Sequence, residues 1–174
     1  MNARLVTLIT ALTLFFGCSK TNYQLGQCDK LYLDFKKGTL NGVSPTASMD
    51  EIKKAFPCFT GQTEEGSKFN CGGGVFFLNH QFFIYTHRDY IDIRKDFKGT
   101  LSNNALGLKK EGLIKLFGQP DDILKHDAAP YGGITHVHQY SKNWGTLAFF
   151  EKEGIISEIE LHHGKKIGAI EYCF

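Results

Sequence analysis

An internal repeat constrains the fold of this chain more than any other feature. The stretch GTLNGVSPTASMDEIKKAF, residues 38–56, aligns without a gap onto GTLSNNALGLKKEGLIKLF, residues 99–117, at an offset of 61 positions. Gly, Thr, Leu, Lys and Phe recur at matching positions, and both copies run on into aromatic, alternating segments. The repeat predicts two copies of one supersecondary unit.

Each copy contains a short helix with recognisable start and stop signals. In the first copy, Ser48 and Glu51 have the spacing of a capping box, and Pro57 stops the helix. In the second copy, Gly118 and Pro120 serve as a C-cap glycine and a helix breaker. Because both helices are short, they need a sheet to pack against.

Strands are expected after each helix. Segments rich in Phe, Tyr, Ile and Val are separated by the turn sequences NH, KNWG and EKEG, a pattern typical of antiparallel meanders. The expected fold is therefore α+β, with two tandem repeats that each pack a short helix on an antiparallel β-meander. The expected strands are 74–78, 81–94, 134–140, 145–150 and 155–163.

The stretch YTHRDYIDIR, residues 85–94, contains the His-Arg-Asp of a protein-kinase catalytic loop. The other kinase motifs, a Val-Ala-Ile-Lys-like lysine and Asp-Phe-Gly, are missing. As one extended strand, the stretch alternates its side chains between two faces. Arg88, Tyr90, Asp92 and Arg94 then share a face, and such a mixture of aromatic and charged groups is enriched at protein interfaces. We predict that these four residues bind a protein; a solvated ladder of cross-strand pairs is the alternative.

The N-terminus indicates export. Arg4, the apolar run 5–16 and the small residue Gly17 form the pattern of a signal peptide. The run is shorter than the roughly 20 apolar residues that span a bilayer. The sequence LFFGC resembles a bacterial lipobox, which implies acylation of Cys18 and attachment to a membrane; an ordinary secretory signal cut nearby is the alternative. The expected divisions are a signal peptide at 1–17, a lipidated linker at 18–37, and repeats at 38–98 and 99–174.

Four cysteines remain after Cys18: Cys28, Cys58, Cys71 and Cys173. In an exported chain an even set predicts disulfides, and three pairings are possible. We expect Cys58–Cys71 and Cys28–Cys173, each contributing roughly 3–5 kcal/mol by the loop-entropy estimate. A zinc site is the alternative, although none of the four lies in a C-x-x-C pair.

Other side chains offer little support for catalysis. Asp121 and Asp122 follow a helix end, where a solvated turn or cap is expected. His136 and His138 alternate on one strand, and the pair at 162–163 lies on another, so three imidazoles converging on a metal ion are an alternative to ordinary surface histidines. We expect no metal and no cofactor. Without Arg4 the chain has 19 Lys and Arg against 18 Asp and Glu, which argues against a nucleic-acid partner.

Several motifs between residues 38 and 161 resemble a known family. The GTL entry, the helix ending in LFGQPDD and the segment WGTLAFFEKEGIISEIEL are similar to the repeat of β-lactamase-inhibitor-like proteins and of small outer-membrane-assembly lipoproteins that share their fold. The resemblance implies one or two helix-plus-sheet units that present a sheet face to another protein, with a disulfide in the first unit. In its general features the chain also resembles periplasmic immunity lipoproteins that neutralise toxins delivered by type VI secretion.

These features together predict a non-enzymatic, lipid-anchored protein of the bacterial cell envelope that faces the periplasm. Ser19 after the lipidated cysteine fits sorting to the outer membrane. The expected partner is another protein, either a secreted toxin that the chain would neutralise as an inhibitor or immunity protein, or an envelope component. One alternative is a structural accessory lipoprotein of outer-membrane assembly or cell-wall maintenance. The other is a metal-dependent enzyme.

Overall fold

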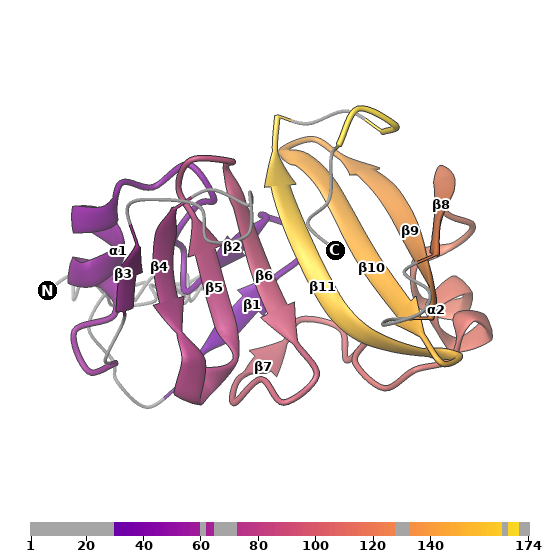
Figure 1. The fold of residues 1–174 in the computed structure, drawn as a ribbon, viewed down its shortest axis with the longest axis horizontal. Coiled ribbons are helices and arrows are strands. Elements are labelled where there is room, and N and C mark those ends of the chain that lie inside the picture. The colour runs from indigo at the N-terminus through magenta and orange to yellow at the C-terminus, as the bar shows by residue number, and fades with distance from the viewer. Residues whose placement is uncertain (1–29, 60–61, 65–72, 128–132, 165–166, 171–174) are drawn as a thin grey trace, which may run out of the picture.

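Two sheets and two short helices make up the α+β fold (Figure 1). The computed structural model describes residues 30–59, 62–64, 73–127, 133–164 and 167–170. A large antiparallel sheet has the strand order β3-β4-β5-β6-β11-β10-β9-β8, and a small sheet has the order β2-β1-β7. The elements are β1 Tyr32–Asp34, β2 Thr39–Leu40, α1 Met49–Ala55, β3 Gln62–Glu64, β4 Gly74–Phe77, η1 Leu78–His80, β5 Phe82–Tyr85, β6 Tyr90–Arg94, β7 Thr100–Leu101, α2 Lys110–Phe117, β8 Asp122–Asp127, β9 Ile134–Lys142, β10 Gly145–Lys152 and β11 Ile155–His163.

The large sheet consists of two consecutive meanders. The first runs from β3 to β6 and the second from β8 to β11, and each follows one of the helices. The last strands of the two meanders, β6 and β11, pair antiparallel in the middle of the sheet. We call this central strand pair the seam.

The small sheet brings both GTL motifs together. β1 pairs antiparallel with β2 and parallel with β7, so the Thr-Leu pairs 39–40 and 100–101 flank it on its two sides. β1 lies within the segment 18–37 that was expected to be a linker, and its Leu33 is fully buried. Three strand residues are too few for an alternating pattern to stand out from a linker.

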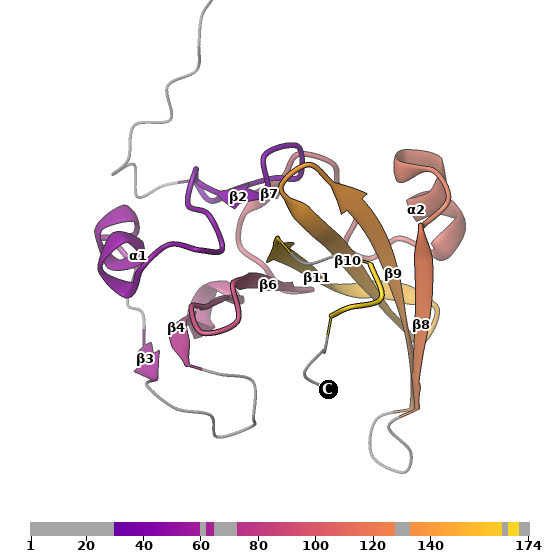
Figure 2. The ribbon, with the colours of Figure 1, turned by 90° about the horizontal axis from the view of Figure 1, so that it is seen from above.

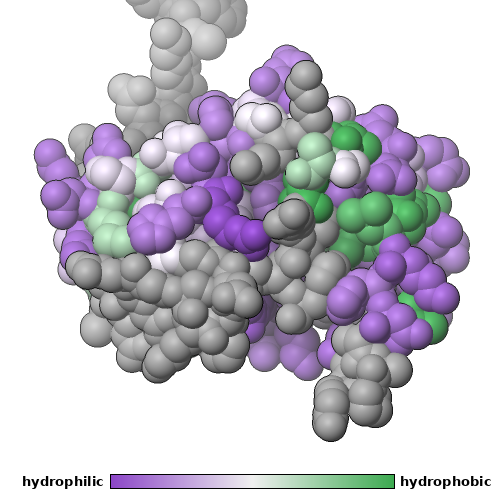
Figure 3. Space-filling model, turned by 45° about the horizontal axis from the view of Figure 1, so that its top comes forward, coloured by the Kyte–Doolittle hydropathy of each residue, from purple (hydrophilic) through white to green (hydrophobic). Residues whose placement is uncertain are grey.

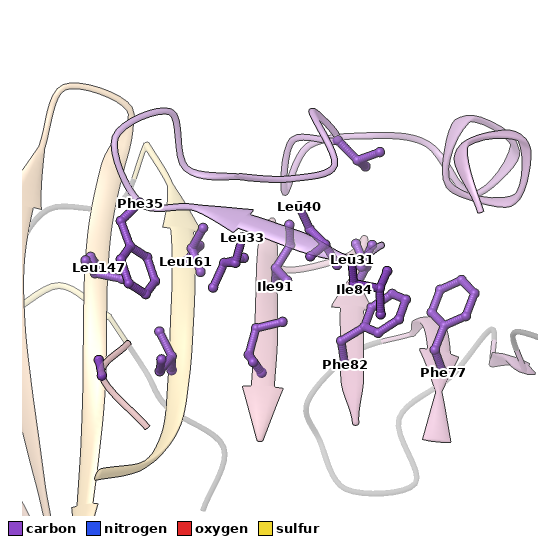
Figure 4. Packing of buried hydrophobic residues seen from close by; sticks show 14 of the residues in the cluster. Leu31, Leu33, Phe35, Leu40, Phe77, Phe82, Ile84, Ile91, Leu147 and Leu161 are labelled. Atoms are coloured by element: carbon purple, nitrogen blue, oxygen red, sulfur yellow. The ribbon is translucent and has the colours of Figure 1, made fainter. Parts of the chain in front are cut away.

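Both helices and the small sheet cover the same face of the large sheet, which we call the inner face (Figure 2). The main hydrophobic core lies between these layers. Leu33 and Leu40 of the small sheet project toward the large sheet, which contributes Phe82, Ile91 and Leu161 (Figure 4). Burial of these apolar side chains supplies the main stabilisation of the fold.

The helix signals predicted from the sequence are confirmed. Ser48 caps α1 through a reciprocal capping box, in which the Ser48 N–H donates to Glu51 at 2.8 Å and the Glu51 N–H donates to the Ser48 hydroxyl at 3.3 Å. α1 ends at Ala55, two residues before Pro57. α2 ends at Phe117, and the predicted C-cap residue Gly118 has a positive φ of 81°, which glycine adopts readily.

The prediction of one continuous strand over 81–94 is wrong. β5 and β6 form a hairpin whose turn is residues 86–89, closed by a hydrogen bond from the Arg88 N–H to the Tyr85 carbonyl at 3.2 Å. Asp89 adopts a left-handed φ of 53°, which an aspartate tolerates better than most residues. The turn contains no glycine or proline, so the usual sequence signals for a turn were missing.

The short strands β2, β3 and β7 and the longer strand β8 were not predicted either. Asp122 was expected in a solvated turn or cap, but it is the first residue of β8, the edge strand beside β9. The preceding residue, Asp121, accepts a hydrogen bond from the Ser141 N–H at 2.7 Å and so ties the start of β8 to β9. Within the described parts of the chain, no helix has the length and apolar character needed to cross a membrane.

Candidate functional site

Charged and aromatic side chains gather on the outer face of the seam, opposite the face that the helices cover. The segments YIDIR and SEIELHH alternate polar with apolar residues, and their cross-strand register is fixed by backbone pairing. Ile91 and Ile93 point into the core, so the intervening side chains point outward. The outward pairs are Tyr90 with His162, Asp92 with Glu160, and Arg94 with Glu158. We call these six residues the seam cluster.

The seam cluster is unusually buried for its charge. Asp92, Glu160 and His162 are only 1–3% exposed. Asp92 and Glu160 lie directly opposite each other, and like charges in this position destabilise a sheet. Buried ionisable groups need partners or a change of protonation state.

Arg94 is the most exposed member of the seam cluster. Its side chain is 46% exposed, yet its Nε lies 3.0 Å from the buried Asp92 Oδ2. The guanidinium carbon also lies 4.5 Å from the centre of the Phe83 ring, within the range of a cation–π contact. Arg94 is therefore held in one orientation while part of it stays accessible.

Stacked rings extend the seam cluster toward β5. The Tyr85 and Tyr90 rings stack at 4.3 Å with an interplanar angle of 11°, and the Tyr90 and His162 rings stack at 4.8 Å. The His162 Nε2 lies 2.5 Å from the Glu160 Oε2. These contacts connect three neighbouring strands into one polar and aromatic network.

Burial shifts the ionisation of the acids. It raises the pKa of Glu158 to about 9, with a further contribution from the charges of Asp92 and Glu160. Burial also raises the pKa of Glu160 well above its usual range. The pKa of Asp92 rises to about 6 because burial outweighs the opposing effect of Arg94. For Arg94 burial acts to lower the pKa, but the neighbouring carboxylates outweigh it, so its pKa is raised.

Three of the four residues predicted to bind a protein share a face in the structure. Tyr90 and Asp92 are buried on the outer face, and Arg94 is exposed there. Arg88 lies in the β5–β6 turn and is half-buried. The acids and histidine of β11 were not predicted as part of the site, although their alternating spacing was visible within a predicted strand. The missing information was that β11 pairs with β6.

The histidines do not converge. His138 is buried, and its Nε2 lies 2.7 Å from the Glu151 Oε2. His162 lies on β11, and β10 separates that strand from β9, which carries His138. Over the described ranges of the chain, no three His, Cys, Asp or Glu side chains are placed to hold a metal ion.

The predicted cysteine chemistry falls largely outside the described residues. Cys58 is disulfide-bonded. The lipidation site Cys18 and the remaining three cysteines, Cys28, Cys71 and Cys173, lie outside the described residues, as does the signal peptide. The pairing of Cys58, the second disulfide and the lipid anchor stay predictions.

A surface pocket of ≈ 290 Å³ lies near the β9–β10 hairpin and the end of β11. None of the seam cluster lines it. The cluster is built into packed strands, and such a surface suits contact with a macromolecule better than enclosure of a small ligand. The pocket is lined by Ser141, Lys142, Asn143, Trp144, Gly145, His163 and Gly164.

No protein-family model matches this chain, and no curated protein or solved structure shows significant similarity to it.

Proposed function

We propose that this chain is an exported, lipid-anchored and non-enzymatic protein of the bacterial envelope that binds another protein through the outer face of the seam. The observation that carries the proposal is the state of Arg94, which is half-exposed and held by Asp92 and Phe83. Arginine and tyrosine are enriched among the residues that contribute most to binding. Tyr85, half-buried beside Tyr90, extends the same surface.

Preorganisation explains why Arg94 suits this role. A free arginine side chain loses rotamer freedom when it binds, which costs about 0.5–1.5 kcal/mol. The 3.0 Å contact with Asp92 and the packing on Phe83 already restrict Arg94 in the unbound chain. A partner carboxylate or backbone carbonyl would then meet a cation whose orientation is fixed.

The surface of the molecule differs in hydropathy from one region to another. Figure 3 shows hydrophilic residues across the middle of the molecule, and apolar surface gathered on the half that contains β8 to β11. Protein interfaces combine charged or aromatic residues with apolar contacts that exclude water around them.

We further propose that the chain is a tandem duplication with a β-lactamase-inhibitor-like arrangement. Three facts support this proposal: the repeated GTL motif, the helix that follows each motif, and the meander that follows each helix. In this arrangement the sheet face opposite the helices would contact the partner. The partner would be a secreted toxin that the chain neutralises, or an envelope component.

Affinity capture with matched charge reversals tests the binding surface. The mature protein would be used as bait with the envelope proteins and secreted toxins of the producing cell. Arg94→Glu is expected to weaken recovery of a specific partner at least tenfold, because it inverts the anchor and repels Asp92. Lys125→Glu makes the same charge change at an exposed position of β8 and should leave recovery unchanged. Equal recovery with both variants would contradict the proposed surface.

A further inference from the structure

A pair of opposed acids is the most unusual feature of the seam. Asp92 and Glu160 face each other across β6 and β11, and both are almost fully buried. Glu158 lies two residues from Glu160 on the same face and contacts the Asp92 carboxyl. Three carboxyl groups therefore meet where the two meanders join.

Two arginines and one histidine surround these acids in the described part of the chain. On β6 the neighbours are Arg94, which pairs with Asp92, and Tyr90. On β11 the neighbour is His162, in contact with Glu160. Among the described residues, the other facing groups are Tyr85 of β5, Arg88 of the turn, and the neutral side chains Phe83 of β5 and Thr146, Ala148 and Phe150 of β10.

One oxygen shows where a proton is needed. Asp92 Oδ1 is buried and has no hydrogen-bond partner among the described residues. A carboxylate cannot donate to another carboxylate, whereas a protonated carboxyl can. A proton on Glu158 would let its carboxyl donate a hydrogen bond to the Asp92 carboxyl that it contacts, and would remove one of the charges.

We propose that the seam is a proton-dependent clasp, in which Glu158 and Glu160 hold protons in the folded chain and the two meanders separate more readily when those protons are lost. The clasp does not depend on the identity of any partner. The burial of Glu160, the contact of the partly buried Glu158 with Asp92 and the raised pKa values of both glutamates point in the same direction. Because an exported protein meets the pH of its surroundings, the clasp would make the joined state of the two meanders respond to that pH.

The direction of the response follows from proton linkage. An unfolded glutamate loses its proton near pH 4.3, whereas the folded acids keep theirs at higher pH. Between the unfolded and the folded pKa values of these acids, the folded state binds more protons than the unfolded state, so its stability falls as pH rises. Each retained proton changes the unfolding equilibrium constant by about tenfold per pH unit.

Urea unfolding of the mature protein between pH 5 and pH 8, in the presence of a chelator, tests the clasp. The unfolding constant of the wild type is expected to rise by at least about tenfold per pH unit. Glu158→Gln and Glu160→Gln should each reduce that slope. Glu111→Gln, at an exposed position on α2, is the matched control and should leave it unchanged. A flat wild-type profile, or a slope that both seam variants retain in full, would overturn the inference.

Infrared spectroscopy of the unaltered chain keeps the inference testable if the variants fail to fold. The carbonyl stretch of a protonated carboxyl should be present in the folded protein at pH 7 and disappear on unfolding in urea at the same pH. Absence of that band from the folded protein at pH 7 would overturn the clasp.

Amide hydrogen exchange adds a local readout. After correction for intrinsic exchange rates, protection of β6 and β11 should fall with rising pH more than protection of the β9–β10 pair. An equal fall in both pairs would contradict a seam-specific effect.

Discussion

The two faces of the seam are built from alternate residues of the same two strands, and they differ in almost every property. On the inner face, Ile91 and Ile93 meet Ile159 and Leu161 in a fully buried apolar core. On the outer face, the seam cluster places acids, an arginine and aromatic rings one residue away from that core. The backbone pairing is shared, so the contrast lies in the side chains alone.

This contrast separates what stabilises the fold from what gives it specific chemistry. The inner face gains free energy by removing apolar surface from water. The outer face buries ionisable groups, which add little net stability and depend on protons and partners. We assign this polar cluster roles in binding and in the response to pH.

The largest effect should come from the inner face. Ile93→Ala removes a fully buried side chain from the seam and is expected to lower the free energy of unfolding by about 2–5 kcal/mol, because it leaves a cavity. Ile155→Ala on β11 makes the same truncation at a side chain that is 40% exposed, and should have a clearly smaller effect. Urea unfolding at pH 6 measures both, and equal losses would show that the inner seam is not the dominant core.

A smaller loss is expected on the outer face. Arg94→Ala leaves the buried Asp92 carboxylate without its cation, which should lower the free energy of unfolding by about 1–3 kcal/mol at pH 7. The effect should shrink at pH 4, where Asp92 is protonated in both variants because its pKa is about 6. A loss that is the same at both pH values would show that packing on Phe83, and not the ion pair, carries the contribution.

The change in the free energy of unfolding caused by Glu158→Gln should have opposite signs at low and high pH. The folded pKa of about 9 lies above the unfolded value, so the contribution of Glu158 to wild-type stability is fully present below about pH 4.5 and is lost as pH rises toward 9. Glutamine stays neutral, so the variant should be more stable than the wild type by about 1–2 kcal/mol at pH 8 and no more stable at pH 4. Thermal or urea unfolding at the two pH values decides the point. A variant less stable than the wild type at both would contradict a protonated Glu158.

The smallest effect is expected at the turn that joins β5 to β6 and places Tyr85 beside Tyr90 on the outer face. Asp89 has a φ of 53°, a conformation that glycine adopts without strain. Asp89→Gly is expected to leave the hairpin intact and to change the free energy of unfolding by no more than about 1 kcal/mol. Asp89→Val, which disfavours this conformation, should destabilise the chain more. If valine were tolerated as well as glycine, the turn geometry would need revision.

The features that could be predicted from the sequence are local ones. The capping box at Ser48, the end of α2 before Gly118 and the strand 155–163 each depend on neighbouring residues, and the structure has all three where they were expected. The turn at 86–89 was missed because its left-handed residue is an aspartate without an adjacent glycine. β1 was missed because three residues carry too little periodic signal.

The site was only half predictable for a different reason. Tyr90, Asp92 and Arg94 could be placed on one strand face because alternation along a strand is local. Their partners on β11 are more than sixty residues away, and strand pairing at that distance leaves no trace in a single sequence. The burial that shifts the pKa values of Glu158 and Glu160 arises from that pairing, so it was not visible either.

Photocrosslinking in the producing cell compares the two sides of the molecule most directly. A photoreactive residue at Lys95, which is exposed and follows Arg94 directly in the chain, reports on partners that contact the end of β6 at Arg94. The same residue at Lys110, exposed on α2, reports on the opposite side, where the helices lie. The account predicts a discrete protein adduct from position 95 that Arg94→Glu abolishes, and no such adduct from position 110. The same adduct from both positions, or an adduct from position 110 alone, would contradict it.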